Sequence, residues 1–314
     1  MASSNLPAKS SKKKNPTVTR LSFECSGGAT EFIDVGRALS ILNRKFFRAG
    51  LYYYINSVEI YNNETGVVDF HTLQDSWVTR NAHQRGEALF DKMNDLTGPP
   101  MSMVGLPKYH DFKVYMSDLH RTTGSINPSV HGINAAFSIG GMTPNDWVYS
   151  TFVSADDDGD AIQQADDFNV HMIGPHVGSA ANWTSVGLVQ SYGDSRQLPH
   201  YTDPSLPIEA AADPMLNIFD YSSEEQLNDI VTNLDNDNDS PPYDLDYYIG
   251  ESASSMQQVA RIGTEIGVGR VGRASGFCAP FGLICIDPHG VSTAFRVVIN
   301  LATGNYKGVY AERV

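Results

Sequence analysis

The feature that most constrains the fold is a pair of adjacent strands expected early in the chain. Residues 51–62 read LYYYINSVEIYN, a density of aromatic and β-branched side chains that is typical of a β-strand. Residues 66–71 (GVVDFH) would be its antiparallel partner, because the Asn-rich, Gly-ended stretch 62–66 favours a turn. Alternating apolar residues at 17–25 and 29–35 predict two more strands before this hairpin.

Further along the chain, strands outnumber helices. The 27 glycines and the low charged content of 18% also favour turns and strands over long surface helices. We expect helices at 37–47, from Asp75 to about 93, and at 223–234, where Ser222 and Glu225 match a capping box. The remaining expected strands are 112–116, 147–153, 168–173, 184–192, 281–286, 293–301 and 307–312. Helices placed between strands at irregular spacing argue against a doubly wound parallel sheet and favour a two-sheet sandwich with long loops.

Charge is distributed unevenly along the chain. Residues 1–48 hold nine Lys and Arg against three Asp and Glu, a net of +6. Residues 150–260 hold one base, Arg196, against twenty acids, a net of −19, in a protein whose formal charge is −14. This separation indicates two surfaces that meet different environments.

The positive end is a short polar arm, residues 1–16, that is too polar to fold. Its four lysines have the charge density and freedom of movement needed to neutralise phosphates without reading sequence. A nuclear localisation signal and a solubilising tail would use the same residues, and both alternatives stay open. Basic residues in the folded part could extend this surface. The candidate nucleic-acid-binding residues are Lys9, Lys12, Lys13, Lys14, Arg20, Arg44, Lys45 and Arg48, with Arg37 beside them.

Two acidic loops concentrate the oxygen ligands that a hard cation such as calcium requires. The candidate ligands are Asp156, Asp158 and Asp160 in the first loop and Asp235, Asp237 and Asp239 in the second. The second loop departs from an EF-hand, because Ser240 occupies the glycine position and Pro241 follows it. Solvated acidic loops without a cation are the simpler alternative.

Enzyme signatures are weak. Residues 267–272 spell GxGxxG, but no buried strand precedes them and Gly276 and Pro280 interrupt the helix that should follow. The nine histidines are scattered without a metal-binding spacing. No apolar run is long enough for a membrane span, and the basic N-terminus is not followed by the apolar segment of a signal peptide. We therefore expect neither catalysis nor membrane insertion.

The combination of basic arm (SSKKKNP), strand-rich body (LYYYINSVEIYN) and closing strands (TAFRVVINLATGNYKGVYAERV) resembles the single-jelly-roll capsid proteins of small icosahedral viruses. Those of small circular single-stranded DNA viruses are the most similar in style. The resemblance implies an all-β fold, an antiparallel two-sheet sandwich of jelly-roll type with long loops and two or three short inserted helices. It implies a flexible basic arm at 1–16 and a shell domain at 17–314, with acidic loop insertions at about 155–166 and 195–255.

The resemblance also implies what the protein does. It would self-assemble into an icosahedral shell and package a viral genome without sequence preference. Its partners would be copies of itself and the genome, and it would occur in the virion and, during assembly, inside the host cell, including the nucleus. One departure is the arm, which carries four lysines where such proteins often have long arginine-rich arms. Packaging would then either depend on the folded inner face or be weak.

Two other classes remain open. A carbohydrate-binding or metal-dependent β-sandwich enzyme would keep the fold and use the Asp and His residues, and turnover or a stoichiometrically bound transition metal would favour it. A cellular interaction module with a basic tail would stay monomeric.

Overall fold

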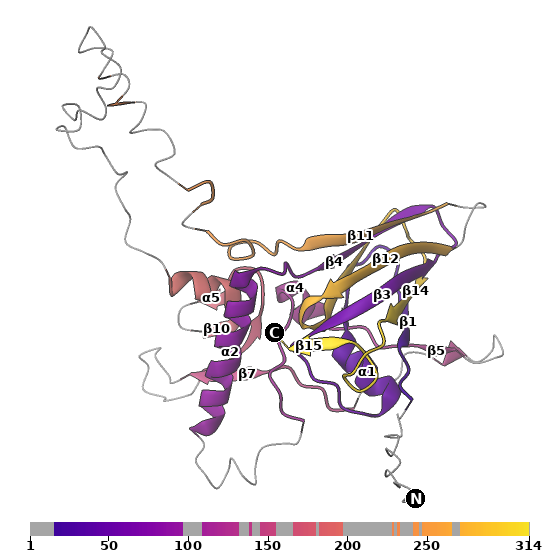
Figure 1. Cartoon of the computed structure of the whole chain (residues 1–314), viewed down its shortest axis with the longest axis horizontal. Helices are drawn as coiled ribbons and strands as arrows, with labels where there is room; N and C mark the ends of the chain where they lie inside the picture. Colours follow the sequence, from indigo (N-terminus) through magenta and orange to yellow (C-terminus); the bar gives the residue numbers. More distant parts are fainter. Residues whose placement is uncertain are drawn as a thin grey trace, which may run out of the picture.

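The computed structural model describes residues 16–96, 109–131, 138–139, 145–154, 166–179, 182–196, 228, 231–232, 241–244, 247–265 and 271–313. Two antiparallel sheets form a sandwich on one side of the molecule (Figure 1). The first sheet has the order β1-β14-β3-β12, with β15 paired to the start of β3, and the second has the order β11-β4-β13-β2. Their bounds are β1 Arg20–Cys25, β2 Glu31–Asp34, β3 Leu51–Tyr61, β4 Gly66–Thr72, β11 Gln257–Thr264, β12 Val271–Ala279, β13 Leu283–His289, β14 Phe295–Leu301 and β15 Ala311–Arg313.

The strand pairing of the sandwich is nested. The first of its eight main strands pairs with the last (β1 with β14), the second with the seventh (β2 with β13), the third with the sixth (β3 with β12) and the fourth with the fifth (β4 with β11). A long antiparallel ribbon rolled up in this way, with its strand pairs shared between two sheets, is a jelly roll. The expected all-β jelly-roll sandwich is confirmed.

The sandwich core follows the period-two alternation of its strands. In β1, Leu21, Phe23 and Cys25 point inward, and every second residue of β14 does the same. In β3 the inward set changes from odd positions up to Ile55 to even positions from Val58. The register against β14 shifts at the same place, so a β-bulge at residue 56 keeps both halves of the long strand facing the core.

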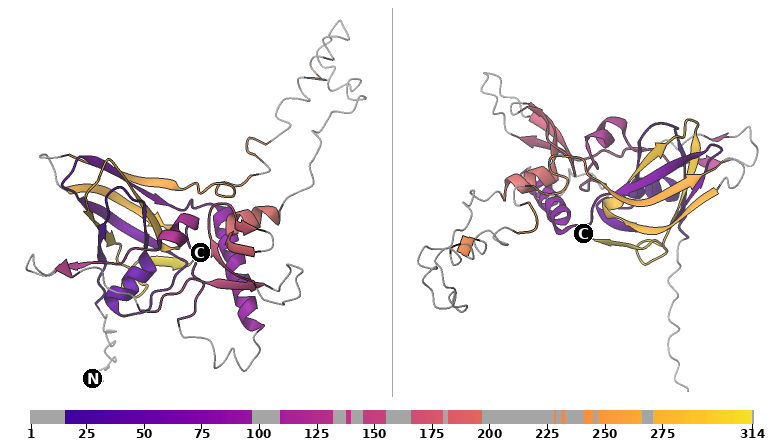
Figure 2. Two further views of the ribbon diagram at one scale, coloured as in Figure 1. Left: turned by 180° about the vertical axis from the view of Figure 1, so that it is seen from behind. Right: turned by 90° about the horizontal axis from the view of Figure 1, so that it is seen from above.

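A single connection, residues 73–256, separates β4 from β11, and its described part lies beside the sandwich (Figure 2). Its described part contains helices α2 (Trp77–Asp95), α4 (Asp118–Thr123) and α5 (Leu188–Asp194) and a sheet of order β7-β8-β10-β9. The strands of this sheet are β7 Thr151–Ser154, β8 Asp166–His171, β9 Val177–Ser179 and β10 Asn182–Gly187; a two-stranded ribbon joins β5 (Val130–His131) to β6 (Ser138–Ile139). We call residues 73–256 the insertion. Both expected acidic segments fall mainly on residues outside the described part of it.

The insertion has its own apolar core, which includes one face of the sandwich. In β13, Ile284 and Ile286 point into the sandwich core, whereas Leu283 and Cys285 point into the core of the insertion. Phe32 of β2 joins the latter group. Because alternate residues enter two different cores, this segment of sequence is apolar without a break.

The charge separation follows this architecture. The insertion holds seven Lys and Arg against 27 Asp and Glu, a net of −20, and the rest of the chain holds fifteen against nine, a net of +6. The arm and the jelly roll together are therefore basic, and the acidity belongs to the insertion.

Several expected elements differ from the observed ones. The strand expected at 184–192 is β10 followed by α5, because Leu188 and Val189 are buried together with Tyr192 and Gly193 at helical spacing. The segment 112–116 is extended but forms only one bridge, from Tyr115 to His171. Of the helix expected at 223–234, only residues 228, 231 and 232 are described, and they are helical.

The two strands β11 and β12 were not expected. The GxGxxG run ends inside β12, where Gly272 is the second residue of the strand, so it does not open a helix. Among the described residues, no helix is long and apolar enough to cross a membrane.

Candidate nucleic-acid interface

The arm leaves the folded domain beside helix α1 (Val35–Asn43). Thr17 donates from its hydroxyl to the carbonyl of Lys307 at 2.6 Å. The Val18 N–H donates to Asn43 Oδ1 at 2.7 Å, and Asn43 Nδ2 donates back to the Val18 carbonyl at 3.1 Å. The last residue of α1 and the turn before β15 therefore fix the root of the arm.

Three of the expected basic residues lie together at this root. Arg44 is the C-cap of α1 in the left-handed conformation (φ 49°), and its side chain is exposed. Lys45 Nζ lies 3.5 Å from the carbonyl of Pro16, the first described residue. Arg48 is exposed, and its backbone is fixed on both sides, since its N–H donates to the Tyr306 hydroxyl at 3.0 Å and its carbonyl accepts from Tyr53 Oη at 2.7 Å.

A fourth cation, Lys307, was not among the expected residues. Its Nζ donates to the Phe46 carbonyl and lies 5.3 Å from the centre of the Tyr306 ring and 5.7 Å from that of Phe47. The residue is separated from Arg44 by more than 250 positions, so only the closed fold brings the two charges to the same end. We call Arg44, Lys45, Arg48 and Lys307 the basic end.

Arg20 belongs to a different surface. Its guanidinium forms an ion pair with Glu59 at 3.0 Å on the sheet β1-β14-β3-β12, and Arg273 approaches the same carboxylate at 3.5 Å. One carboxylate is thus shared by two guanidinium groups, so the charge of Arg20 is only partly compensated within the sheet. The arm lysines Lys9, Lys12, Lys13 and Lys14 lie outside the described residues.

The expected cation ligands cannot be placed. Asp156, Asp158, Asp160, Asp235, Asp237 and Asp239 all lie outside the described residues, so calcium binding by these loops stays a prediction. Within the described part, no group of three or more His, Cys, Asp or Glu side chains is arranged to hold a metal ion.

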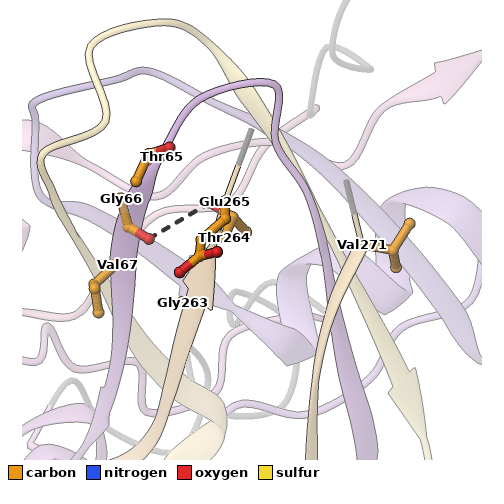
Figure 3. Close-up of a pocket in the computed structure, with 7 residues that line it drawn as sticks. All are labelled: Thr65, Gly66, Val67, Gly263, Thr264, Glu265 and Val271. Atoms are coloured by element: carbon orange, nitrogen blue, oxygen red, sulfur yellow. Dashed lines mark hydrogen bonds between the residues drawn. The ribbon is translucent and has the colours of Figure 1, made fainter. Parts of the chain in front are cut away.

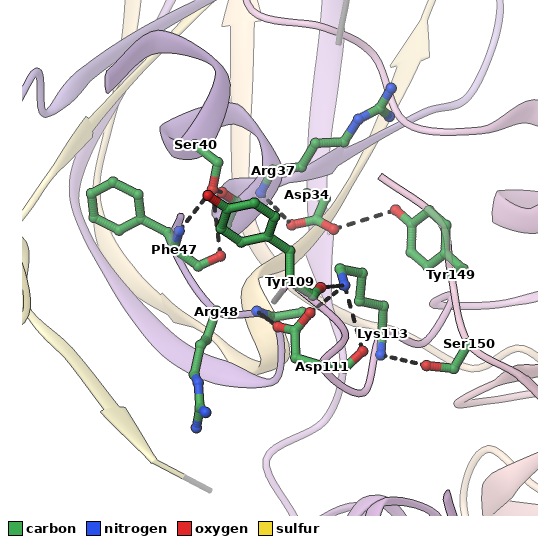
Figure 4. Close-up of polar contacts among 12 residues, drawn as sticks. Asp34, Arg37, Ser40, Phe47, Arg48, Tyr109, Asp111, Lys113, Tyr149 and Ser150 are labelled. Carbon is green, nitrogen blue, oxygen red and sulfur yellow. Dashed lines mark hydrogen bonds and ion pairs between the residues drawn. The ribbon is translucent and has the colours of Figure 1, made fainter. Parts of the chain in front are cut away.

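A buried polar network joins α1 to the insertion (Figure 4). Asp34 caps α1 by accepting from the Arg37 N–H at 3.0 Å, and its other oxygen accepts from the Tyr149 hydroxyl at 3.3 Å. Burial raises the pKa of Asp34 to about 6, although the hydrogen bonds and the Arg37 charge act in the opposite direction. This carboxyl therefore titrates close to neutral pH.

The network continues into the insertion, and its hydrogen bonds can all point the same way, toward Asp34. The Met116 N–H donates to His120 Nδ1 at 3.0 Å, so the neutral ring of His120 carries its proton on Nε2. That nitrogen lies 2.7 Å from Ser125 Oγ, which lies 2.9 Å from Tyr149 Oη. Each group can donate to the next, and the chain ends on the Asp34 carboxylate. Burial lowers the pKa of His120 to about 3, with the Arg37 charge adding to the effect, and this keeps the ring neutral.

A second set of contacts holds the loop after Arg48. The Ala49 N–H donates to Asp111 Oδ2 at 3.0 Å, and Asp111 forms an ion pair with the buried Lys113. Lys113 also donates to the carbonyl of Tyr109 at 2.9 Å. The insertion therefore holds the loop that follows Arg48 in place. The sequence alone did not indicate these contacts.

The opposite end of β3 carries a shallow pocket with different chemistry (Figure 3). It is lined by Thr65, Gly66, Thr264, Glu265 and neighbouring residues and has a volume of about 450 Å³. The Thr264 hydroxyl donates to the Glu64 carbonyl at 2.9 Å and accepts from Asn62 Nδ2 at 2.9 Å, so it is engaged in holding the turn. None of the described residues that line this pocket is basic, so no described side chain there would neutralise a phosphate.

Comparison with known proteins gives no match: no family model, no curated protein and no solved structure resembles the chain closely enough to count.

Proposed function

We propose that the protein is a viral capsid protein that self-assembles into an icosahedral shell and packages nucleic acid through its basic arm and basic end. The observation that carries the proposal is the division of charge between the parts of the fold. A jelly roll and arm of net +6 carry, on one connection, an insertion of net −20. A shell subunit needs this polarity, because its inner surface meets polyphosphate and its outer surface meets solvent.

Electrostatics gives each part of this arrangement a role. Thr17 and Val18 fix the root of the arm against Lys307 and α1, and Lys45 contacts the Pro16 carbonyl, so the arm joins the folded domain at the basic end. Phosphate neutralisation by these charges releases counterions, so binding should weaken steeply with salt. The acidic insertion would be repelled by nucleic acid and would therefore face away from it.

Electron microscopy of the purified full-length protein, with the ratio of absorbance at the nucleic-acid and protein maxima, tests the proposal. We expect closed shells that contain nucleic acid. Replacing Lys9, Lys12, Lys13 and Lys14 by Gln should leave the shells intact and reduce their nucleic-acid content, whereas the same four positions changed to Arg should retain it. Protein that stays monomeric across salt and pH would contradict the assembly part of the proposal. Equal nucleic-acid content in the Gln and Arg variants would contradict the role of the arm.

A second candidate function, carbohydrate binding by the β-rich body, is favoured by one feature of the insertion. Trp77 is 56% exposed, and its ring lies edge-on to Tyr192 at 6.3 Å and to Tyr248 at 5.8 Å. The Arg196 guanidinium lies 5.8 Å from the same indole ring. Exposed aromatic platforms of this kind can stack on sugar rings. Binding to immobilised glycans that Trp77→Ala abolishes, by a protein that forms no shells, would favour this function over the first.

A further inference from the structure

A cavity opens beside the basic end, between α1 and two segments of the insertion. Its volume is about 450 Å³, within the range of roughly 300–1,000 Å³ that small-molecule sites occupy. Residues 109, 113 and 145–147 of the insertion form one side, and α1 with the residues that follow it forms the other. The cavity therefore exists only because the insertion is folded against the jelly roll.

Three aromatic rings line this cavity. The Phe46 ring lies 5.1 Å from that of Tyr109 and 6.1 Å from that of Trp147, tilted by 48° and 49°. The rings are too steeply inclined to stack on one another. Tyr109 is 55% exposed, and the indole N–H of Trp147 has no hydrogen-bond partner among the described residues. The wall thus offers aromatic surface, chiefly the exposed Tyr109 ring, whereas the unpaired indole N–H of Trp147 is buried.

Cations surround the same cavity. Among the described residues, Arg37, Arg44, Lys45 and Lys113 line it, together with one acid, Asp146. Lys113 is compensated by its ion pair with Asp111, but Arg44 is exposed at the rim and Lys45 is partly exposed there. Aromatic walls with a cationic rim fit a ligand that is both planar and anionic, which excludes neutral sugars and aliphatic chains as the preferred occupants.

From these observations we infer that the cavity binds an unpaired nucleobase of single-stranded nucleic acid, with the adjoining phosphates on Arg44 and Lys45. The inference rests on the proposed packaging function and adds the strand class to it. Bases of a duplex are stacked and paired, so only a single strand can place a base in a side-chain pocket. Lys45 both lines the cavity and contacts the root of the arm, so a strand neutralised by the arm lies next to the pocket.

The test is fluorescence anisotropy with the full-length protein and two labelled probes, an oligothymidylate of about 20 nucleotides and a duplex of the same length, at an ionic strength of about 0.15 M. Tyr109→Ala removes the most accessible ring, and Tyr109→Phe keeps it. Tyr247→Ala, at an aromatic residue that is 62% exposed on the acidic segment, is the matched control.

We expect Tyr109→Ala to weaken single-strand binding about tenfold, which is about 1.4 kcal/mol, while duplex binding and the salt dependence stay unchanged. Tyr109→Phe and Tyr247→Ala should both bind like the unaltered protein. Single-strand affinity that is the same in all variants would overturn the pocket and leave the packaging function standing. An equal loss for both probes would also overturn it, because the ring would then contribute no strand selectivity. An unaltered protein that binds neither probe would overturn the packaging function itself.

Discussion

The buried carboxyl of Asp34 makes the free energy of unfolding depend on pH, and a single substitution can separate this contribution from the others. Its folded pKa is about 6, above the ordinary value of 3.8. The folded state therefore binds more protons than the unfolded state in this window, and stability falls as pH rises from about 4 through about 6. For these two pKa values, linkage gives a loss of about 1.3 kcal/mol between pH 5 and pH 7.

Asp34→Asn removes this titration and retains an oxygen that can cap α1. The unaltered protein should therefore lose about 1.3 kcal/mol more than the variant between about pH 5 and about pH 7. Tyr149→Phe is the matched control: it removes a hydrogen bond that lowers the Asp34 pKa but keeps the carboxyl, so the pH dependence should persist or grow.

Urea unfolding followed by tryptophan fluorescence measures the effect, because all three tryptophans, at positions 77, 147 and 183, lie in the insertion that the network joins to α1. The absolute difference at one pH also includes the altered hydrogen bond to Tyr149, so the quantity to compare is the change with pH. Stability curves of the unaltered protein and Asp34→Asn that run parallel from pH 5 to pH 7 would refute the reasoning.

Three further predictions concern two other buried side chains and one close backbone contact. Burial lowers the pKa of His83 to about 3, so the folded protein loses stability as pH falls below about 6.5. In urea unfolding, His83→Leu should lose about 2 kcal/mol less stability than the unaltered protein when the pH is lowered to about 5. An equal loss in both proteins would contradict this. Asp69 accepts two hydrogen bonds from Arg261, at 2.8 and 3.0 Å, and Asp69→Asn should cost roughly 1–3 kcal/mol in thermal unfolding, where an unshifted midpoint would argue against the pair. A Cβ on Gly276 would lie 2.2 Å from the Ile55 carbonyl oxygen, so Gly276→Ala should cost roughly 1–3 kcal/mol in urea unfolding. It should also speed hydrogen exchange at the amides of β12. Exchange rates equal to those of the unaltered protein would contradict this.

The strands that were predicted well are those with one apolar face and a clear alternation. Residues 51–62 and 66–71 match β3 and β4 within one residue at each end, and 293–301 matches β14 within two. The strands that were missed, β11 and β12, are at the ends of their sheets, and most of their residues are exposed or half-buried. Their stability comes from pairing with β4 and β3, which leaves little periodicity in the sequence itself.

The candidate site was predictable only in part. Arg44, Lys45 and Arg48 follow one another closely, so their charges were visible as a cluster. Lys307 and Trp147 reach the same end through pairings between distant segments, and no local pattern marks them. Whether any of these residues contacts nucleic acid stays a prediction.

The nested pairing of the jelly roll also sets the order in which the protein can be made. Strand β1 ends at Cys25, but its partner begins at Phe295, so the first strand to leave the ribosome must wait for nearly the whole chain. Such distant pairings carry a large loop-closure cost and fold late. The first sheet is therefore completed only late in synthesis, and a chain truncated before Phe295 would leave β1 without its partner strand.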